Sequence, residues 1–125
     1  MNYVKSYREL EVYKLSRKLS KDIFQWSINF PTEEKYSLTD QIRRSSRSVG
    51  AQIGEAWGKR KYEKHFILKL SDADSEQFET QHWLEVAHEC HYLDDNEKGR
   101  LLNYCESIGK MLQSMMDKAS LFWKP

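Results

Sequence analysis

Basic side chains recur at helical spacing in the middle of the chain. Arg43 and Arg44 precede Arg47 by four and three residues, so a helix would place all three on one surface. Guanidinium groups bind phosphate oxygens in pairs, and cations that meet nucleic-acid phosphates release counterions. The sequence therefore predicts a surface for RNA or DNA. Its candidate residues are Arg43, Arg44, Arg47, Lys59, Arg60, Lys61 and Lys64.

The distribution of charge allows a second interpretation of the same arginines. Residues 72–97 contain nine Asp or Glu and no Lys or Arg, whereas residues 1–71 contain fifteen basic and eight acidic residues. The arginines would then pair with this acidic stretch, either within one subunit or across an interface between subunits. The net charge of +1 is also low for a dedicated nucleic-acid-binding domain. Both interpretations stay open at this point.

Two Glu-x-x-His pairs raise the question of a metal site. Glu79 precedes His82, and Glu85 precedes His88, each by three residues. Di-metal carboxylate oxidoreductases need such pairs on two different helices and a glutamate from each of the other two. Both pairs here lie on one segment, so the sequence predicts a solvated acidic face, no metal and no cofactor. A di-metal oxidoreductase is the remote alternative.

Nucleophilic catalysis has no support in the residue pattern. Cys90 and His91 are adjacent, so their side chains would diverge on a helix. The sequence has no glycine-rich phosphate loop, no metal-spaced cysteine pair and no nucleophile elbow. It therefore predicts no catalytic residue and no enzyme. Cys90 and Cys105 fall at apolar helical positions, and we expect both thiols to be buried.

Helices are the elements that must position these residues. Two prolines and five glycines in 125 residues leave few turns. Apolar residues at steps of three and four predict helices over about 7–29, 38–57, 62–91 and 97–122. The third stripe is interrupted by Gln77, and Phe78 and Trp83 are expected to broaden it. The expected stripes are Val12, Leu15, Leu19, Ile23, Trp26 and Phe30; Leu38, Ile42, Ser45, Val49, Ile53 and Ala56; Phe66, Leu70, Ala73, Thr80, Leu84 and Ala87; and Leu101, Cys105, Ile108, Leu112, Met115, Ala119 and Phe122.

Local signals mark where these helices begin and end. Pro31 ends the first, because the residue before proline avoids helical angles. Capping-box spacing marks the starts of three helices. The pairs are Ser6 with Glu9, Ser37 with Asp40, and Asp94 with Glu97.

Small and polar residues on the second segment point to inter-helix contacts. Gly50, Gly54 and Gly58 are spaced by four, so they form one strip on a helix. Each glycine costs a helix about 1 kcal/mol relative to alanine, and close packing of another helix would compensate. Buried polar groups fix register and partner choice at some cost in stability. The residues expected in an inter-helix polar network are Gln41, Ser45, Ser48, Gln52 and Glu55.

Together these patterns predict one all-α domain over residues 1–125, an antiparallel up-down-up-down four-helix bundle. Its length suits a single core without metals or disulfides. No apolar run approaches the roughly 20 residues that span a bilayer, and no secretory signal follows Met1. We therefore expect a cytoplasmic protein with no membrane partner.

The second segment also resembles a known family. The run from Asp40 to Val49, DQIRRSSRSV, resembles the second-helix motif of the bacterial four helix bundle proteins, also called 23S rRNA intervening-sequence proteins. The similarity covers nearly the whole chain, and the combination of motifs is specific. Further matching residues are Ile53, Glu55, Ala56, Trp57, Lys59, Arg60, Tyr62, His65, Phe66, Lys69 to Asp74, Glu79, Thr80, Gln81, Trp83, Leu84, Tyr92 and Leu93.

This resemblance implies an up-down-up-down bundle that assembles into a ring, typically a homopentamer. Some members are encoded inside insertions in 23S rRNA genes. A related branch, the accessory proteins of diversity-generating retroelements, binds nucleic acid and a reverse transcriptase through a basic pentamer. The family itself has no established biochemical activity. Two departures stand out: Gln52 and Gly54 replace the usual Asn and Ala, and His91 replaces a common Gly.

The functional hypothesis is a non-enzymatic, oligomeric structural or adaptor module. It would bind RNA, DNA or a nucleic-acid-processing protein weakly through the basic surface. The segregated charge suits a ring, whose heterologous interface joins two different surfaces of neighbouring subunits. The alternative is a protein–protein interaction module that involves no nucleic acid.

Overall fold

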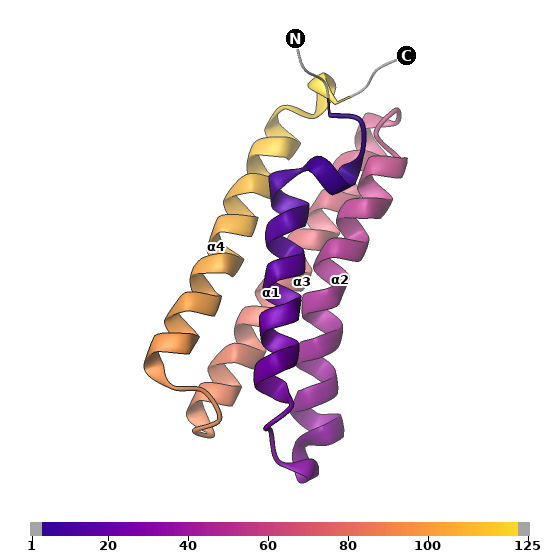
Figure 1. Cartoon of the computed structure of the whole chain (residues 1–125). Coiled ribbons are helices and arrows are strands. Elements are labelled where there is room, and N and C mark those ends of the chain that lie inside the picture. The colour runs from indigo at the N-terminus through magenta and orange to yellow at the C-terminus, as the bar shows by residue number, and fades with distance from the viewer. Residues whose placement is uncertain (1–3, 123–125) are drawn as a thin grey trace.

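The computed structural model describes residues 4–122, and within that range the fold is entirely helical. Its helices are α1 (Glu11–Ser27), α2 (Asp40–Gly58), α3 (Glu63–Glu89) and α4 (Asp95–Asp117). Consecutive helices run in opposite directions, so the start of α1 and the end of α4 lie at the same end of the bundle (Figure 1). Each helix packs on its sequence neighbours, and α1 also packs on α4. The predicted all-α four-helix bundle is confirmed.

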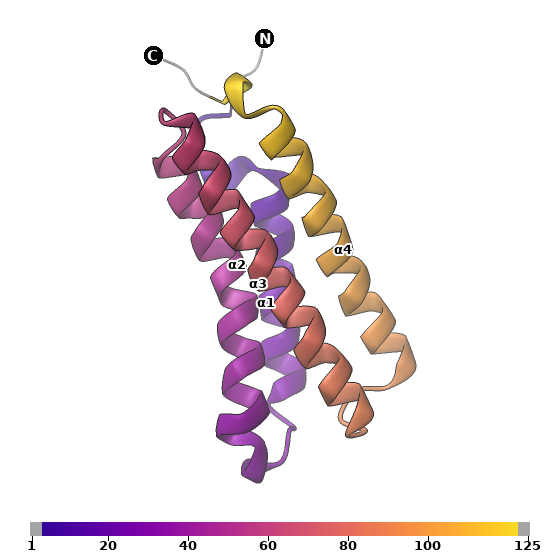
Figure 2. The same ribbon diagram turned by 180° about the vertical axis from the view of Figure 1, so that it is seen from behind.

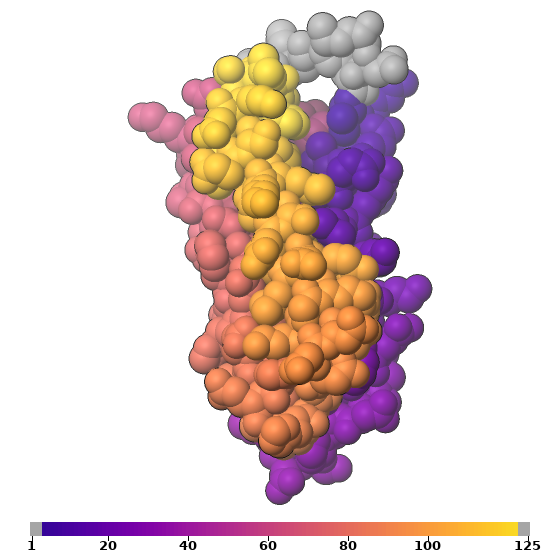
Figure 3. Space-filling model, turned by 90° about the vertical axis from the view of Figure 1, so that its left-hand side faces the viewer, coloured from indigo at the N-terminus to yellow at the C-terminus, as the bar shows by residue number. Residues whose placement is uncertain are grey.

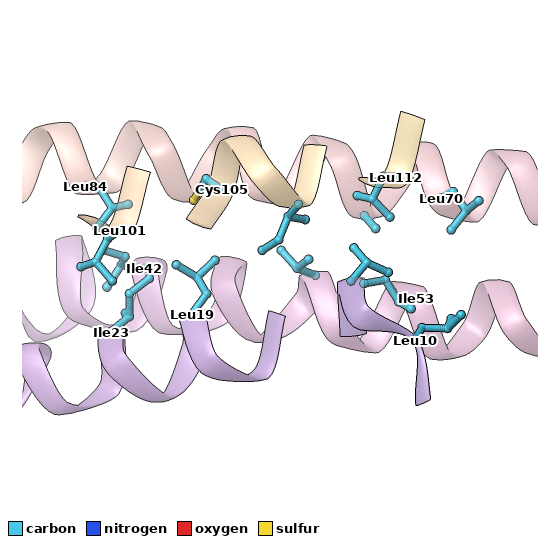
Figure 4. Packing of buried hydrophobic residues seen from close by; sticks show 14 of the residues in the cluster. Leu10, Leu19, Ile23, Ile42, Ile53, Leu70, Leu84, Leu101, Cys105 and Leu112 are labelled. Carbon is cyan, nitrogen blue, oxygen red and sulfur yellow. The ribbon is translucent and has the colours of Figure 1, made fainter. Parts of the chain in front are cut away.

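One apolar seam runs along the centre of the bundle. The predicted stripes of α2, α3 and α4 are buried almost without exception, and Figure 4 shows side chains of all four helices converging on this seam. Leu19, Ile53 and Phe66 are examples with no measurable exposure. Burying a side chain of this size stabilises the fold by about 1.5–3 kcal/mol. The regular apolar spacing was therefore a reliable signal for the core.

Polar residues also lie in the seam. Gln77, which interrupts the third stripe, is buried with 1% exposure and donates to Asp74 Oδ1 at 2.8 Å. The side-chain oxygen Oε1 of Gln77 accepts from Gln81 Nε2 at 2.7 Å. Both polar atoms of the Gln77 side chain therefore have a hydrogen-bond partner, so this polar residue is buried without an unsatisfied group. A Cβ atom on Gly109 of α4 would lie 3.1 Å from Gln77 Nε2, so this glycine lets α4 approach α3 closely.

The first helix is shorter than predicted. A single 3₁₀ turn (Tyr7–Glu9) precedes it, and Leu10 is extended, with ψ of 131°. On a continuous helix Leu10 would sit about 200° from Val12, facing solvent. The break instead lets Leu10 reach the core, where it is 8% exposed. The helix also ends at Ser27 rather than at residue 29, because Ser27 is followed by tighter turns that return Phe30 to the core.

The predicted cap of the second helix is wrong. Helical structure begins earlier, with a 3₁₀ turn (Thr32–Glu34) and a π-helical turn (Lys35–Thr39) that lead directly into α2. Ser37 therefore lies inside a turn and donates to Glu34 Oε1 at 2.9 Å instead of capping α2. The Asp94 cap is confirmed, because its Oδ1 accepts from Glu97 N at 2.7 Å.

Side-chain bonds tie these connections to the bundle. Tyr92, just after α3, donates to Glu34 Oε2 at 2.9 Å, and this hydrogen bond raises the pKa of Tyr92 to about 12. On α4, Arg100 donates to Glu97 and to Asp22 of α1, at 2.7 and 2.9 Å.

Figure 2 shows α3 crossing the back of the bundle, and Figure 3 shows α4 forming one side between α3 and α1. The fourth helix ends at Asp117, and the remainder of its predicted range begins with a 3₁₀ turn (Ala119–Leu121).

The turn after α3 holds a non-glycine residue in the left-handed region. His91 has φ of 64°, and Tyr92 N donates to Ala87 O at 2.9 Å across it. This bond, from an N–H to the carbonyl five residues earlier, is the Schellman ending of a helix, in which glycine usually occupies the left-handed position. The departure noted in the sequence therefore falls at a position where a Cβ atom is strained.

We expect His91→Gly to stabilise the fold by about 0.5–1 kcal/mol, because relief of the left-handed strain exceeds the added chain entropy. His82→Gly is the matched control on the exposed middle of α3, where it should cost about 1 kcal/mol. Urea unfolding followed by circular dichroism measures both. Destabilisation by both substitutions would contradict the role given to His91.

Only one of the two cysteines lies in the core. Cys105 is buried with 0% exposure, and burial raises the pKa of its thiol to about 12. Cys90 is exposed, so the prediction that both thiols are buried is wrong. It follows the last residue of α3, where the chain leaves the bundle seam.

A thiol reagent distinguishes the two cysteines directly. The native chain should react quickly at one thiol, Cys90, because a buried, protonated thiol is inert. In denaturant a second equivalent of the reagent should be consumed, because Cys105 becomes accessible. Colorimetric titration with and without denaturant gives both values. Two rapidly reacting thiols in the native chain would contradict the burial of Cys105 in the core.

Candidate nucleic-acid interface

The α1 and α2 helices lie side by side along the front of the bundle (Figure 1), in close contact at Gly50. A Cβ atom on Gly50 would lie 3.1 Å from Ser16 Oγ, and one on Gly54 would lie 3.8 Å from the Tyr7 ring. Gly58 has open space around it. Close packing of α1 thus accounts for Gly50, and loosely for Gly54, but not for Gly58. The short distance brings the outer side chains of both helices onto one surface.

Three hollows run along this surface. The largest, of about 830 Å³, lies over the start of α2 and is here called the Tyr36 hollow. Its lining residues are Tyr36, Asp40, Gln41, Arg43, Arg44, Arg47, Ser48 and Ala51. A second, of about 780 Å³, is lined by Arg17, Lys18, Ser20, Lys21, Asp22, Phe24 and Arg47. A third is lined by Tyr7, Tyr13, Arg17, Ser20, Arg47, Gly50, Ala51 and Gly54.

Basic side chains from both helices line these hollows, and Arg47 lines all three. We call this set the α1–α2 basic face. Its members are Arg17, Lys18, Lys21, Arg43, Arg44 and Arg47. The three cations from α1 are not among the residues predicted from the sequence. The four-residue spacing of Arg17 and Lys21 was visible, but only the packing of α1 on α2 shows that they share a surface with the arginines.

The three arginines that α2 contributes to this face differ in how firmly their guanidinium groups are held. Arg43 is half-buried, its Nε donates to Ser27 Oγ at 2.7 Å, and its guanidinium lies 4.7 Å from the Phe24 ring centroid. Arg47 also lies over Phe24, at 5.5 Å, but is exposed. Arg44 is exposed and donates to Gln41 Oε1 at 3.0 Å. Arg43 is therefore tethered, whereas Arg44 and Arg47 present donors to solvent.

Among residues 4–122, no member of the α1–α2 basic face forms an ion pair with a carboxylate. Partners in the acidic stretch belong to other cations: Lys69 lies 3.9 Å from Asp72, and Lys98 lies 3.2 Å from Glu85. The predicted pairing of the arginines with this stretch inside one subunit is thus absent from the described chain. Pairing across subunits stays a prediction.

The other four candidates form a separate cluster. Lys59, Arg60 and Lys61 lie in the turn between α2 and α3, and Lys64 lies in the first turn of α3. Lys59 follows Arg47 by twelve residues, which is about 18 Å along a helix. Arg60 folds back on Trp57, 4.1 Å from the ring centroid, and donates to its carbonyl at 2.9 Å. The predicted surface is therefore two clusters, and only the first is joined by cations from α1.

The expected polar network forms only in part. Ser45 is buried and accepts from Thr80 Oγ1 of α3 at 2.9 Å. Glu55 is exposed rather than buried, with Lys69 Nζ of α3 at 3.8 Å. The remaining three residues make no inter-helix hydrogen bond in the described chain: Gln41 pairs with Arg44 on its own helix, Ser48 is half-buried, and the buried Oε1 of Gln52 has no partner. They lie outside the seam, where helical spacing alone does not predict contact.

The Glu-x-x-His residues do not converge. Trp83 Nε1 donates to Glu79 Oε2 at 3.0 Å, and His82 is exposed. Glu85 pairs with Lys98, whereas His88 Nε2 lies 2.6 Å from Asp95 Oδ1, a contact that lowers the pKa of Asp95. Between residues 4 and 122 no group of three or more His, Cys, Asp or Glu could hold a metal ion. In the same range, none of the helices is apolar over a length that would cross a bilayer.

Comparisons with known proteins agree with this architecture. The sequence profile of a family described as 23S rRNA-intervening sequence protein matches residues 8–114. A similar fold is found in the crystal structure of a protein of unknown function from the S23 ribosomal protein family of Bacteroides thetaiotaomicron VPI-5482. The two sequences are 30% identical, and the TM-score is 0.76. The match covers 85% of this chain and 95% of that one. No curated protein gives a significant match.

Proposed function

The chain belongs to the 23S rRNA-intervening sequence protein family, and from that premise we propose that it is a non-catalytic helical module that binds RNA through the α1–α2 basic face. The binding is weak, depends strongly on salt and is indifferent to sequence. Phosphate contacts from arginine and lysine supply affinity without reading bases. The family description contains 23S rRNA but names no ligand, so the choice of RNA over DNA is part of the proposal and is tested below.

The observation that carries this proposal is six cations on two adjacent helices without carboxylate partners in the described chain. Like charges held together repel one another, and phosphates would relieve that repulsion. The near-neutral net charge does not oppose local binding, because the acidic stretch lies mainly on α3 and the turn after it. Salt at ordinary ionic strength screens charges over roughly 8–10 Å, so distant carboxylates repel the phosphates bound at this face only weakly.

The direct experiment is a mobility-shift or anisotropy titration of labelled RNA at low and at moderate salt. Micromolar protein should shift the RNA at low salt, and the shift should weaken steeply as salt rises. DNA of the same sequence and length tests the preference for RNA. Absence of any shift at low salt with micromolar protein would end the proposal.

A second candidate function is self-assembly into a ring that recruits a protein. The exposed surface of α3 favours it, since Leu68 is 58% exposed and Phe78, within the acidic stretch, is 60% exposed. A basic face on one copy and an acidic face on the next would form a heterologous interface, as a homopentamer requires. The mass of the native assembly, measured with and without nuclease, separates the two. A monomer whose mass is unchanged by nuclease would contradict the ring.

A further inference from the structure

One aromatic side chain stands over the largest basic hollow. Tyr36 lies in the π-helical turn before α2, where Asp40 N donates to Lys35 O, five residues back. Its side chain is 72% exposed, the largest exposure among the large hydrophobic residues of the described chain. It lines the Tyr36 hollow together with Arg44 and Arg47. A π-helical turn is rare and is often found at functional sites.

The residues around Tyr36 form one row. Tyr36, Asp40, Arg44 and Arg47 follow each other at steps of four, four and three and line the same hollow. Such steps keep side chains on one helix surface. The row therefore presents an aromatic ring and a carboxylate at one end and, at the other, two exposed guanidinium groups that have no carboxylate partner in the described chain. Lys35 adds a cation 5.2 Å from the Tyr36 ring centroid.

This order of groups favours an unpaired strand over a duplex. In a duplex the bases are stacked on each other and only phosphates and groove edges are accessible, so an exposed tyrosine ring contributes little. A single strand offers free base faces, which stack on aromatic side chains whatever their sequence. Combined stacking and cation contacts are the usual chemistry of single-strand binding.

Asp40 gives the row a polarity. Its exposed carboxylate stands between Tyr36 and Arg44 and repels phosphate, but it accepts hydrogen bonds from base amino groups and from ribose 2′-hydroxyls. Phosphates are therefore directed toward Arg44 and Arg47, and bases toward the Tyr36 end. A ribose 2′-hydroxyl near this carboxylate also distinguishes RNA from DNA.

From this arrangement we propose that the Tyr36 hollow binds single-stranded RNA, with a base stacked on Tyr36 and phosphates held by Arg44 and Arg47. The inference rests on the proposed function and adds the strand type and the stacking residue. Because Tyr36 is largely exposed, its replacement leaves the core intact.

The test compares three ligands: a short mixed-sequence RNA, the same RNA annealed to its complement, and the equivalent single-stranded DNA. Tyr36→Ala should weaken single-stranded RNA binding about tenfold and leave duplex binding unchanged. Tyr36→Phe keeps the ring face and should retain the affinity. Tyr62→Ala, at the turn between α2 and α3, removes a tyrosine that is 54% exposed and serves as the matched control.

The outcomes separate this inference from the proposed function. If RNA binds at low salt but Tyr36→Ala binds single strands as well as the parent does, the stacking role is overturned and the phosphate-binding face stands. Loss of duplex and single-strand affinity by the same factor also overturns it. Equal affinity for single-stranded DNA overturns the role of Asp40 toward ribose. If Tyr36→Ala changes the mass of the assembly but not RNA affinity, a second copy occupies the hollow and the inference fails.

Discussion

We expect a variant in which Arg17, Arg44 and Arg47 are all glutamine to bind RNA about 100-fold more weakly than the parent chain at low salt. All three side chains are exposed, and none has a carboxylate partner in the described chain. Each phosphate contact contributes a similar share of sequence-independent affinity, so three losses multiply. Anisotropy titration with one labelled RNA measures the change. Arg43 is left in place because its bond to Ser27 supports the packing of α1 on α2.

The matched control removes three cations from the other cluster. A variant in which Lys59, Lys61 and Lys64 are glutamine has the same net charge as the arginine variant, but its substitutions lie in the turn between α2 and α3 and in the first turn of α3. We expect it to lose far less affinity, because no cations from α1 join this cluster. Equal losses in the two variants would show that net charge alone governs binding, and would contradict a defined face.

Removal of one core ring has the largest expected effect on stability. Phe66→Ala should lower the free energy of unfolding by about 3–5 kcal/mol, through lost transfer energy and the cavity it leaves. Phe66 has 0% exposure, and its ring centroid lies 5.4 Å from that of Phe122 beyond α4. This loss is a large part of the 5–15 kcal/mol typical of a domain. Urea unfolding followed by circular dichroism gives the value at fixed protein concentration.

Phe78→Ala is the internal control for that experiment. It deletes the same ring from the same helix, but Phe78 is 60% exposed. The sequence pattern predicts Phe78 near the core face, and its exposure shows that this prediction is wrong. We expect a change within about 0.5 kcal/mol, as for other surface substitutions. A cost equal to that of Phe66→Ala would mean that Phe78 is covered in solution.

The core was predictable because its signal is long and redundant. Residues such as Ile42, Leu84 and Leu112 recur at helical spacing over many turns, so one irregular position does not obscure the stripe. Local signals failed for two different reasons. Tertiary packing draws Leu10 into the core and breaks the first helix, whereas Ser37 binds Glu34, three residues earlier, because α2 has no free end there to cap. Neither preference appears in the spacing of residues.

The candidate site was predictable only for one helix. The arginines of α2 were visible as a spaced group, but the contribution of Arg17, Lys18 and Lys21 depends on which face of α1 meets α2. That contact is set by Gly50 against Ser16, a small-residue fit that no charge pattern reveals. Tyr36 was missed for a related reason, since the π-helical turn that carries it has no distinct sequence signal.

Ultraviolet crosslinking of the bound RNA, followed by mass spectrometry of the attached peptides, tests the location of the interface most directly. The crosslinked residues should fall within α1, the turn at residues 35–39 and the first half of α2, with Tyr36 and Phe24 prominent because aromatic rings lie among the cations there. Crosslinks confined to α3, to α4 or to the turn between α2 and α3 would contradict an RNA interface on the α1–α2 basic face.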